Sequence, residues 1–496
     1  SKDTTLLEGE FQETALYYLK TQSVRRWSRN GSAVSSDAIG KEQQEVVIVN
    51  KYDSTDAKNH PGKSRIDSMS PFQWDWDKIY IIDKCPIDET LLQITGGKFI
   101  TNVNIVNTRT YVTRGLNIQR SNVLLKGVEH YLAGEYGQDG QLNEGGKAVY
   151  TTPKADPVSG EKKTVIYYPR TGAPYQGFFR LNHCAHVTLQ NCVFSNHLRV
   201  YNNGDDTNST APYDFYAEYC VDLVIDNCHC APTEDDLTGP ADETGIMDKS
   251  RWGTTGTNYC KELTVQNHSS ISRIDAHQGT YNMTVKDSTI GAWGVAAVGF
   301  GELRIDNSFI RSKEYLVKLR NDFGSAWFGD ITITNTKWDI GTYYSAVLIY
   351  ASYDPLYQYM YDTIKEDGMT YYSMLPENIN ISNLTIDAQK DKDGVFLRDN
   401  VPLYSPVMPK RKDANEKYIP IDDKYFNDPS MYKFPLRCTK NFNLSGLTII
   451  KAKTAKYEST GVIAQRPSND NHSEYYFKKY GLKINYKETP TIVTAD

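Results

Sequence analysis

The 496-residue sequence has no long apolar run and no excess of basic residues. A membrane-spanning helix needs about 20 consecutive apolar residues, and the longest weakly polar stretch, 291–301, is short and rich in glycine. The net charge of -6 gives no support to a nucleic-acid-binding protein, which would carry a basic balance or a basic stripe. We therefore expect neither a transmembrane segment nor a nucleic-acid partner.

Cysteine is also scarce, and no two cysteines are spaced as Cys-x-x-Cys. Eight cysteines in a chain of this length do not form a disulfide-rich scaffold, and the missing pairs argue against a zinc site. The sequence starts at Ser1 rather than at methionine. We expect a processed, exported chain, secreted, periplasmic or on the cell surface, whose signal sequence has been removed.

Tyrosine is abundant, with 36 residues against 16 phenylalanines. Its apolar ring and polar tip suit wet binding surfaces and stacking on carbohydrate. Tyrosine is also simply favoured in β-strands, so composition alone leaves both interpretations open.

A five-residue phrase recurs along the chain: apolar, any, apolar, any, then asparagine or a substitute. Its copies are VNIVN from Val103, VLLKG from Val123, VTLQN from Val187, LVIDN from Leu223, LTVQN from Leu263, MTVKD from Met283, LRIDN from Leu303, ITITN from Ile331, INISN from Ile379 and FNLSG from Phe442. The shortest steps between copies are 20 residues. Each phrase alternates like a strand with one buried face. Only a stack of such units can bury these faces, so the repeat predicts a solenoid of parallel strands, with the longer steps as inserted loops.

Two sets of positions around the phrase predict ladders of like side chains. Asparagine tolerates a left-handed turn and can hydrogen-bond to its copies above and below. The fifth positions are Asn191, Asn227, Asn267, Asp287, Asn307, Asn335 and Asn383. Cys184, Cys220 and Cys260 precede their phrases by three residues, and Cys192 and Cys228 each follow the fifth position. We expect these cysteines to be small buried thiols rather than disulfides.

The repeat resembles the right-handed parallel β-helix of the pectate-lyase-like superfamily, over roughly residues 95–450. That superfamily includes polysaccharide lyases, several families of glycoside hydrolases and phage tailspikes. The resemblance implies an all-β fold, a right-handed parallel β-helix solenoid with long loop insertions, but it does not choose a reaction. We expect an N-terminal cap and first strands over 1–95, the β-helix over 96–450 and capping strands over 451–496. Leu6, Phe11, Leu16 and Leu19 have loose helical spacing, which predicts a helical cap over 5–27.

The segment SRIDAHQG places three ionisable side chains on one face of a strand, because residues two apart share a face. Arg273, Asp275 and His277 should point outward, and Ile274 and Ala276 inward. The next rung, WGVAAVG, would form a shallow floor. The rung after it reads YLVKLRND and adds an outward pair, Lys318 and Arg320. We take Arg273, Asp275, His277, Lys318 and Arg320 as the candidate catalytic groove.

Further candidates for substrate binding lie before and within this groove. In DFYAEY, alternation puts Asp214, Tyr216 and Glu218 on one face. The complete set of expected substrate-binding residues is Arg251, His197, Arg199, Asp214, Tyr216, Glu218 and Trp293.

This set of side chains favours β-elimination on an acidic polysaccharide. A base must remove the C5 proton of a uronic acid while cations neutralise the neighbouring carboxylate. His277 could be the base or acid, and Arg273, Lys318 and Arg320 the carboxylate clamp. Asp275 could orient His277 or bind calcium, so a calcium cofactor remains open.

Two alternatives stay open. A glycoside hydrolase needs two flanking carboxylates, for which Asp275 could pair with Asp214, Glu218 or Asp322. A polygalacturonase-like enzyme would have adjacent aspartates and a GHG-like histidine on neighbouring rungs. Here Asp205 and Asp206 lie in an apparent loop, and HQG at 277–279 matches only faintly. The second alternative is a tailspike-like protein that binds polysaccharide. Such proteins usually form trimers, but the chain has no coiled-coil heptads, so we expect a monomer.

Overall fold

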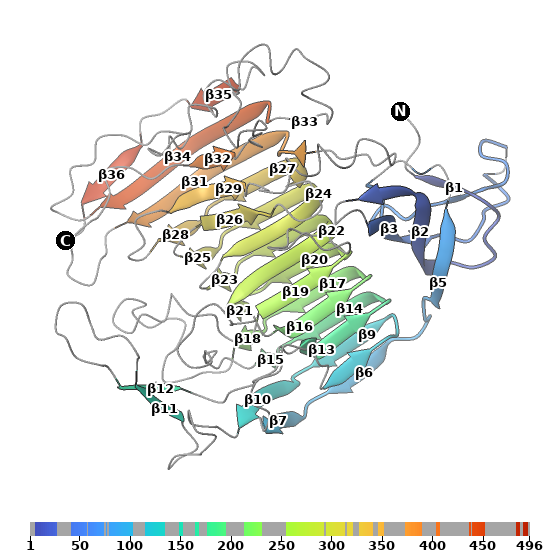
Figure 1. Ribbon diagram of the computed structural model, residues 1–496, viewed down its shortest axis with the longest axis horizontal. Helices are drawn as coiled ribbons and strands as arrows, with labels where there is room; N and C mark the ends of the chain where they lie inside the picture. The colour runs from blue at the N-terminus through green and yellow to red at the C-terminus, as the bar shows by residue number, and fades with distance from the viewer. Residues whose placement is uncertain are drawn as a thin grey trace, which may run out of the picture.

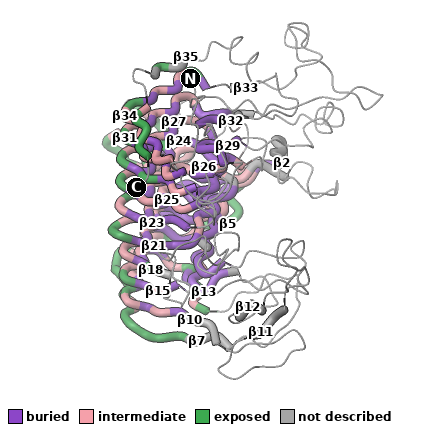
Figure 2. Tube along the Cα trace, turned by 90° about the vertical axis from the view of Figure 1, so that its left-hand side faces the viewer, coloured by how far each residue is buried: buried purple, intermediate pink, exposed green. Residues whose placement is uncertain are grey.

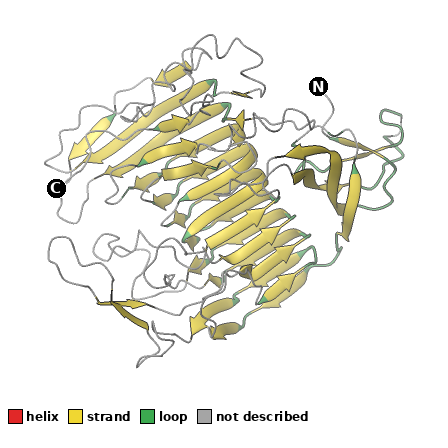
Figure 3. Cartoon of the chain, viewed as in Figure 1, coloured by secondary structure: helices red, strands yellow, loops and turns green. Residues whose placement is uncertain are grey.

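The computed structural model describes residues 5–26, 41–56, 58–73, 76, 79–102, 115–133, 148–151, 164–167, 176–194, 213–230, 254–291, 294–312, 315–320, 327–340, 346–351, 373–388, 403–406, 436–437, 439–451, 483–486 and 490–494. These residues form strands, turns and loops, and none of them is helical (Figure 3). No helix in this described part could therefore span a membrane.

Most strands belong to one 27-stranded sheet that coils on itself (Figure 1). Each circuit of the coil, called a rung below, passes through three stacks of strands, called columns A, B and C. Column A holds β8 (Leu116–Ile118), β13 (Gln176–Asn182), β16 (Tyr213–Glu218), β19 (Thr254–Asn258), the starts of β22 (Arg273–Lys286) and β24 (Val295–Asp306), β26 (Tyr315–Leu319), β29 (Val347–Ala351) and β32 (Tyr404–Pro406).

Columns B and C complete each rung. Column B holds β6 (Leu92–Thr95), β9 (Val123–Lys126), β14 (Ala185–Gln190), β17 (Val221–Asp226), β20 (Lys261–Gln266), the ends of β22 and β24, β27 (Trp327–Thr334), the starts of β31 (Asn378–Ala388) and β34 (Asn441–Lys451), and β35 (Lys483–Tyr486). Column C holds β7 (Lys98–Asn102), β10 (Glu129–Ala133), β15 (Val193–Phe194), β18 (His229–Cys230), β21 (Ser270–Ile271), β23 (Thr289–Ile290), β25 (Phe309–Arg311), β28 (Lys337–Asp339), the ends of β31 and β34, and β36 (Thr491–Thr494). All these pairings are parallel, so the predicted parallel β-helix is confirmed.

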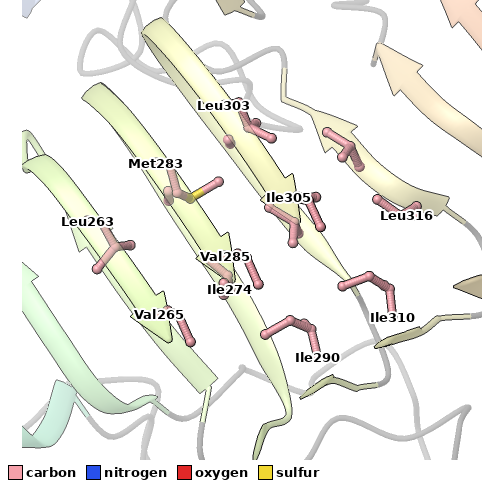
Figure 4. Packing of buried hydrophobic residues seen from close by; sticks show 14 of the residues in the cluster. Leu263, Val265, Ile274, Met283, Val285, Ile290, Leu303, Ile305, Ile310 and Leu316 are labelled. Atoms are coloured by element: carbon pink, nitrogen blue, oxygen red, sulfur yellow. The ribbon is translucent and has the colours of Figure 1, made fainter. Parts of the chain in front are cut away.

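The apolar positions of the phrase form the core. Leu263, Met283 and Leu303 stack in register, and so do the residues two positions later, Val265, Val285 and Ile305 (Figure 4). All are at most 1% exposed. Buried segments recur along the middle rungs of the coil, whereas its end strands β6, β7 and β36 are mostly exposed (Figure 2). Burying one such side chain contributes about 1.5–3 kcal/mol, so repetition of the phrase supplies the stability that a single rung lacks.

Both predicted ladders are confirmed. The seven asparagine or aspartate positions have φ between 43° and 55°, the left-handed conformation that asparagine tolerates. Asn227 donates to Asn191 at 2.7 Å, and Asn383 to Asn335 at 3.0 Å. The five predicted cysteines are buried and free, with 3.5 Å between the Sγ atoms of Cys184 and Cys220.

The expected N-terminal helix is wrong. Residues 5–26 contain β1 (Leu6–Glu8), which pairs with β4 (Lys63–Arg65), and β2 (Ala15–Arg26). β2 is the middle strand of an antiparallel sheet with β3 (Lys41–Val49) and β5 (Tyr80–Pro86). Both faces of β2 are covered: Tyr17 and Leu19 pack within the N-terminal unit, and Leu16 packs toward the coil. A strand buried on both faces has no polar alternation, so its apolar residues resembled a helical stripe.

The N-terminal unit lies beside the coil (Figure 1). Leu16 of β2 shares an apolar cluster with Ala185 and Val221 of column B. The Lys261 ammonium group lies 3.1 Å from the Glu45 carboxylate and 2.6 Å from the Pro71 carbonyl oxygen. Lys261 and Glu45 are almost fully buried, so this pair is enclosed between the unit and the side of the coil.

The connections from column C to column A are short at the middle rungs and long at the rungs before them. From column C to column A the chain takes long paths between Ala133 and Gln176, which include the hairpin of β11 (Ala148–Thr151) and β12 (Thr164–Tyr167), between Phe194 and Tyr213, and between Cys230 and Thr254. Between β21 and β22 only Ser272 intervenes, and the connections before β24 and β26 are also short. The remaining strands, β30 (Ser373–Met374) and β33 (Leu436–Arg437), pair outside the coil.

Candidate functional site

The SRIDAHQG strand follows the predicted alternation. Ile274 and Ala276 are fully buried in the coil core, so Arg273, Asp275 and His277 lie on the outer side of column A. Asp275 and His277 are nevertheless only 3% and 9% exposed, because side chains from other rungs cover them. This face therefore lies outside the core, but side chains from other rungs cover most of it.

Asp275 is the centre of a polar cluster, called the Asp275 cluster below. Its carboxylate lies 3.1 Å from Nη2 of Arg273, accepts a short hydrogen bond from Arg320, and lies 3.6 Å from Nε2 of His277. Tyr213 donates its hydroxyl at 3.3 Å. Burial alone would raise the pKa of Asp275, but Arg273, Arg320 and His277 outweigh it, so this pKa lies far below its usual range.

Two small residues allow the cluster to assemble from different rungs. Gly256 is in register with Asp275 on one side, and Ala296 on the other. The Tyr213 ring lies over Gly256, where an added Cβ would come within 2.5 Å of ring atoms. Arg320 reaches back from the rung beyond Ala296. Tyr213 is not among the residues predicted from the sequence, although the small side chains at 256 and 296 indicate that neighbouring side chains can reach over Asp275.

Lys318 lies outside the Asp275 cluster. It is in register with Ala296, which is itself in register with Asp275, so it occupies the same outward row two rungs further on. Its Nζ is 5.3 Å from the centre of the Tyr315 ring, and that ring stacks on Tyr350 at 6.4 Å. The predicted groove therefore contains two separate cationic points.

Tyr216 and Glu218 lie on the opposite flank of the cluster. Asn258 donates to the Tyr216 hydroxyl at 2.5 Å, and Arg180 lies 3.9 Å from the Glu218 carboxylate. Burial raises the pKa of Glu218, and the charge of Arg180 partly opposes this. Tyr216 is in register with Gly256, and thus belongs to the same outward row as Asp275.

The prediction that Asp214 shares a face with Tyr216 and Glu218 is wrong. The register shifts between Tyr213 and Phe215, and this irregularity breaks the alternation at Asp214. Asp214 is fully buried, with its Oδ1 2.6 Å from Nδ1 of His130, which is also fully buried. The His130 ring stacks on Phe178, a core residue, at 3.9 Å. Asp214 is therefore sealed away from the outer face.

The remaining candidates lie outside the described residues: His197, Arg199, Arg251 and Trp293, together with Asp205, Asp206 and Asp322. Within the described residues, no group of three or more His, Cys, Asp and Glu side chains is placed to hold a metal ion. The calcium cofactor thus stays a prediction.

No protein-family model matches the chain, and no curated protein matches it. Among solved structures, the chain is similar to the crystal structure of the tailspike protein gp49 from Pseudomonas phage LKA1, with a TM-score of 0.31 and 9% identity. The alignment covers 92% of this chain and 64% of the tailspike chain, so this chain spans just under two thirds of that protein's length. The β-helix assignment itself rests on the register of the strands.

Proposed function

We propose that the protein binds an acidic polysaccharide along the outer face of column A. The observation that carries this proposal is the convergence of Arg273 and Arg320 on one buried carboxylate. Two guanidinium groups therefore meet at a single carboxylate. The side chains of Arg273 and Arg320 are 17% and 15% exposed, so they remain within reach of a ligand.

Arginine is suited to this role. Each guanidinium has five N–H donors in a fixed plane, of which Asp275 uses only part. Nε of Arg273 is buried and has no acceptor among the described residues. A carboxylate or sulfate on a sugar would supply acceptors, and the fixed geometry lowers the entropy lost on binding. Tyr350, which is half-buried in the same outward row, adds a ring of the kind on which sugars stack.

The surroundings of the carboxylates do not favour hydrolysis. A glycosidase needs one carboxylic acid that gives up a proton and a second carboxylate across the bond. Asp214 is sealed in the core with His130, and Asp275 is held as an anion between two arginines. Burial raises the pKa of Glu218, as suits an acid, but neither of the other two can serve as its partner across the bond.

A second candidate function is cleavage by β-elimination, which His277 favours because Asp275 lies 3.6 Å from its Nε2. A carboxylate in this position can orient an imidazole. In this step His277 would take the C5 proton of a uronate held by Arg273 and Arg320. The electron pair would form the C4–C5 double bond, the C4–O bond would break, and the leaving oxygen would take a proton from water.

Binding is tested by calorimetry with acidic and neutral polysaccharides, using wild type, Arg320→Ala and the control Arg304→Ala. Arg304 lies on the outer side of column B, where its ion pairs with Glu302 and Asp306 are long and exposed. We expect acidic polymers to bind and Arg320→Ala to weaken them at least about 10-fold, while Arg304→Ala stays within about twofold. Equal binding of neutral polymers, or an unchanged Arg320→Ala, would overturn the proposal.

Cleavage is tested on the same polymers, with and without chelator, by ultraviolet absorbance and by reducing ends. New absorbance together with new ends, lost in His277→Ala while binding persists, supports elimination. New ends without absorbance indicate hydrolysis, and Glu218→Gln is then the decisive variant. Binding with neither signal identifies a protein that binds without cleaving.

A further inference from the structure

We infer that the acidic ligand also contacts Glu218, and that the Glu218 carboxylate takes up a proton when the ligand binds. This inference rests on the proposed function, because it concerns the same outer face of column A, and it adds a second contact and a pH dependence to that function. It follows from the position of Glu218 on this face and from the groups around its carboxylate.

Glu218 lies on the outer face of column A, two rungs before His277. Its neighbour Ala217 is fully buried in the core, so alternation turns Glu218 outward. Glu218 is in register with Asn258 of β19, and β19 pairs with the strand that carries His277. Adjacent strands lie ~4.8 Å apart, so Glu218 and His277 are separated by roughly 10 Å along the coil axis. A polymer that lies along this face toward the earlier rungs therefore passes Glu218.

The positive charges around Glu218 are more distant than those around Asp275. Arg180 lies 3.9 Å from the Glu218 carboxylate, beyond hydrogen-bond distance, whereas Arg273 lies 3.1 Å from Asp275 and Arg320 is closer still. The side chain of Glu218 is 25% exposed, against 4% for Asp275. Glu218 is therefore the more accessible carboxylate and the one whose charge is less well balanced.

The surroundings of Glu218 favour its protonated form more than those of Asp275 do. Burial raises the pKa of Glu218, and the charges of Arg180 and His183 oppose this only in part, whereas two arginines hold the pKa of Asp275 far below its usual range. The Tyr216 hydroxyl hydrogen-bonds to Glu218, which also favours the ionised form. The further titratable groups near Glu218 belong to the coil and to β2 of the N-terminal unit: Cys220, Cys260, Tyr219 and Tyr18.

The sign of the pH dependence follows from the charge of the ligand. An ionised Glu218 repels an anionic group beside it, whereas a protonated Glu218 donates its O–H to that group. A bound anion therefore raises the pKa of Glu218 further, and the complex holds more protons than the free protein between the two pKa values. Affinity should rise as the pH falls through this interval and be constant on either side of it.

The test is calorimetry with low-mass dextran sulfate and with polygalacturonate, between about pH 7.5 and about pH 4.5, in buffers of different ionisation enthalpy. The sulfate groups stay ionised throughout, so proton uptake with dextran sulfate belongs to the protein. Glu218→Gln is neutral at every pH and its amide can donate a hydrogen bond. We expect this variant to bind about fivefold more tightly than wild type at about pH 7.5 and equally well at about pH 4.5, which corresponds to a shift of about 0.7 in the pKa of Glu218. Wild type should take up about 0.4 proton more than Glu218→Gln at the midpoint of the interval.

Two further variants assign the proton to Glu218. Glu262→Gln is the matched control, because burial also raises the pKa of Glu262, but this residue lies on column B, where Asn282 donates to it at 2.7 Å. It should bind and take up protons like wild type. The difference between Glu218 and Gln at position 218 should persist in a His277→Gln background, since His277 also titrates in this range.

The outcomes separate this inference from the proposed function. If Glu218→Gln has the pH dependence and proton uptake of wild type, or if the difference disappears in the His277→Gln background, the inference is wrong, although Arg320-dependent binding still supports an acidic ligand. If neither probe binds at any pH and Arg320→Ala changes nothing, the proposed function fails, and this inference fails with it.

Discussion

Column A contains two buried carboxylates, Asp275 and Asp214, whose surroundings are opposite. Asp275 lies outside the coil, where arginines that reach solvent hold it as an anion. Asp214 lies two rungs earlier, sealed with His130 against Phe178 of the core. The exposed fractions of Asp275 and Asp214 are nearly the same, 3% and 0%. The two carboxylates lie on opposite sides of the sheet, and this side, not the depth of burial, decides which of them can contact a ligand. For Asp214 the side is set by a local shift in strand register.

The largest effect is expected when the sealed pair is broken. Asp214→Ala removes the hydrogen-bond partner that lies 2.6 Å from Nδ1 of His130 in the core, and a buried polar group that loses its partner costs up to about 3 kcal/mol. Chemical denaturation measures the loss in the free energy of unfolding. The double variant His130→Leu, Asp214→Leu should regain most of it, since well-packed apolar residues can replace such a pair. A single variant as stable as wild type would show that the pair contributes little.

A smaller loss is expected from Asp275→Asn. The two arginines lose a charged acceptor, but they can turn toward water, so we expect about 2 kcal/mol. The low pKa of Asp275 fixes the pH dependence. Because the pKa of Asp275 is lower in the folded protein than in the unfolded chain, where it is near 3.9, the ionised carboxylate stabilises the fold above about pH 4. This stabilisation is lost as the pH falls toward the pKa of the folded protein. The difference between wild type and Asp275→Asn should therefore be constant from roughly pH 7 to 5 and shrink below about 4. A difference already gone at pH 6 would contradict this account.

Gly256→Ala tests whether Tyr213 must lie over a small residue to reach Asp275. The added methyl group meets the Tyr213 ring, and overpacking of this kind costs about 1–3 kcal/mol. We also expect weaker binding of acidic polysaccharide, measured by calorimetry. Tyr213→Phe keeps the ring and loses only the hydroxyl, so it should bind better than Gly256→Ala. If both variants bind like wild type, Tyr213 does not position the cluster.

The smallest effect is expected on the solvent side of the ladder. Asn227→Ala removes the hydrogen bond to Asn191 and places alanine at a φ of 49°, for a loss of about 1–2 kcal/mol in thermal or chemical unfolding. Asn227→Gly tolerates that φ and should lose less. Polysaccharide binding should be unchanged in both, because position 227 lies at the turn between columns B and C, away from column A. Weakened binding would show that the ladder affects the site.

The sequence predicted the candidate site where alternation holds and failed where it breaks. Arg273, Asp275 and His277 face outward because their neighbours Ile274 and Ala276 fit the core. Asp214 turned inward because a register shift of one residue reverses alternation, and no residue type in DFYAEY signals such a shift. His130 could not be predicted as its partner, since the two residues are 84 positions apart and meet only through the coil.

The repeating phrase by itself determined the parallel coil, the asparagine ladder and the buried cysteines, because each depends on a short local pattern repeated until the copies stack. Only the tertiary structure decided that residues 15–26 form a strand beside the coil, that Tyr213 and Arg320 converge on Asp275, and that Lys318 stands apart from them. These arrangements depend on which side chains from different rungs lie next to one another. Which side chains become neighbours is fixed by how the rungs stack, and the separation of stacked residues in the sequence changes with the length of each inserted loop.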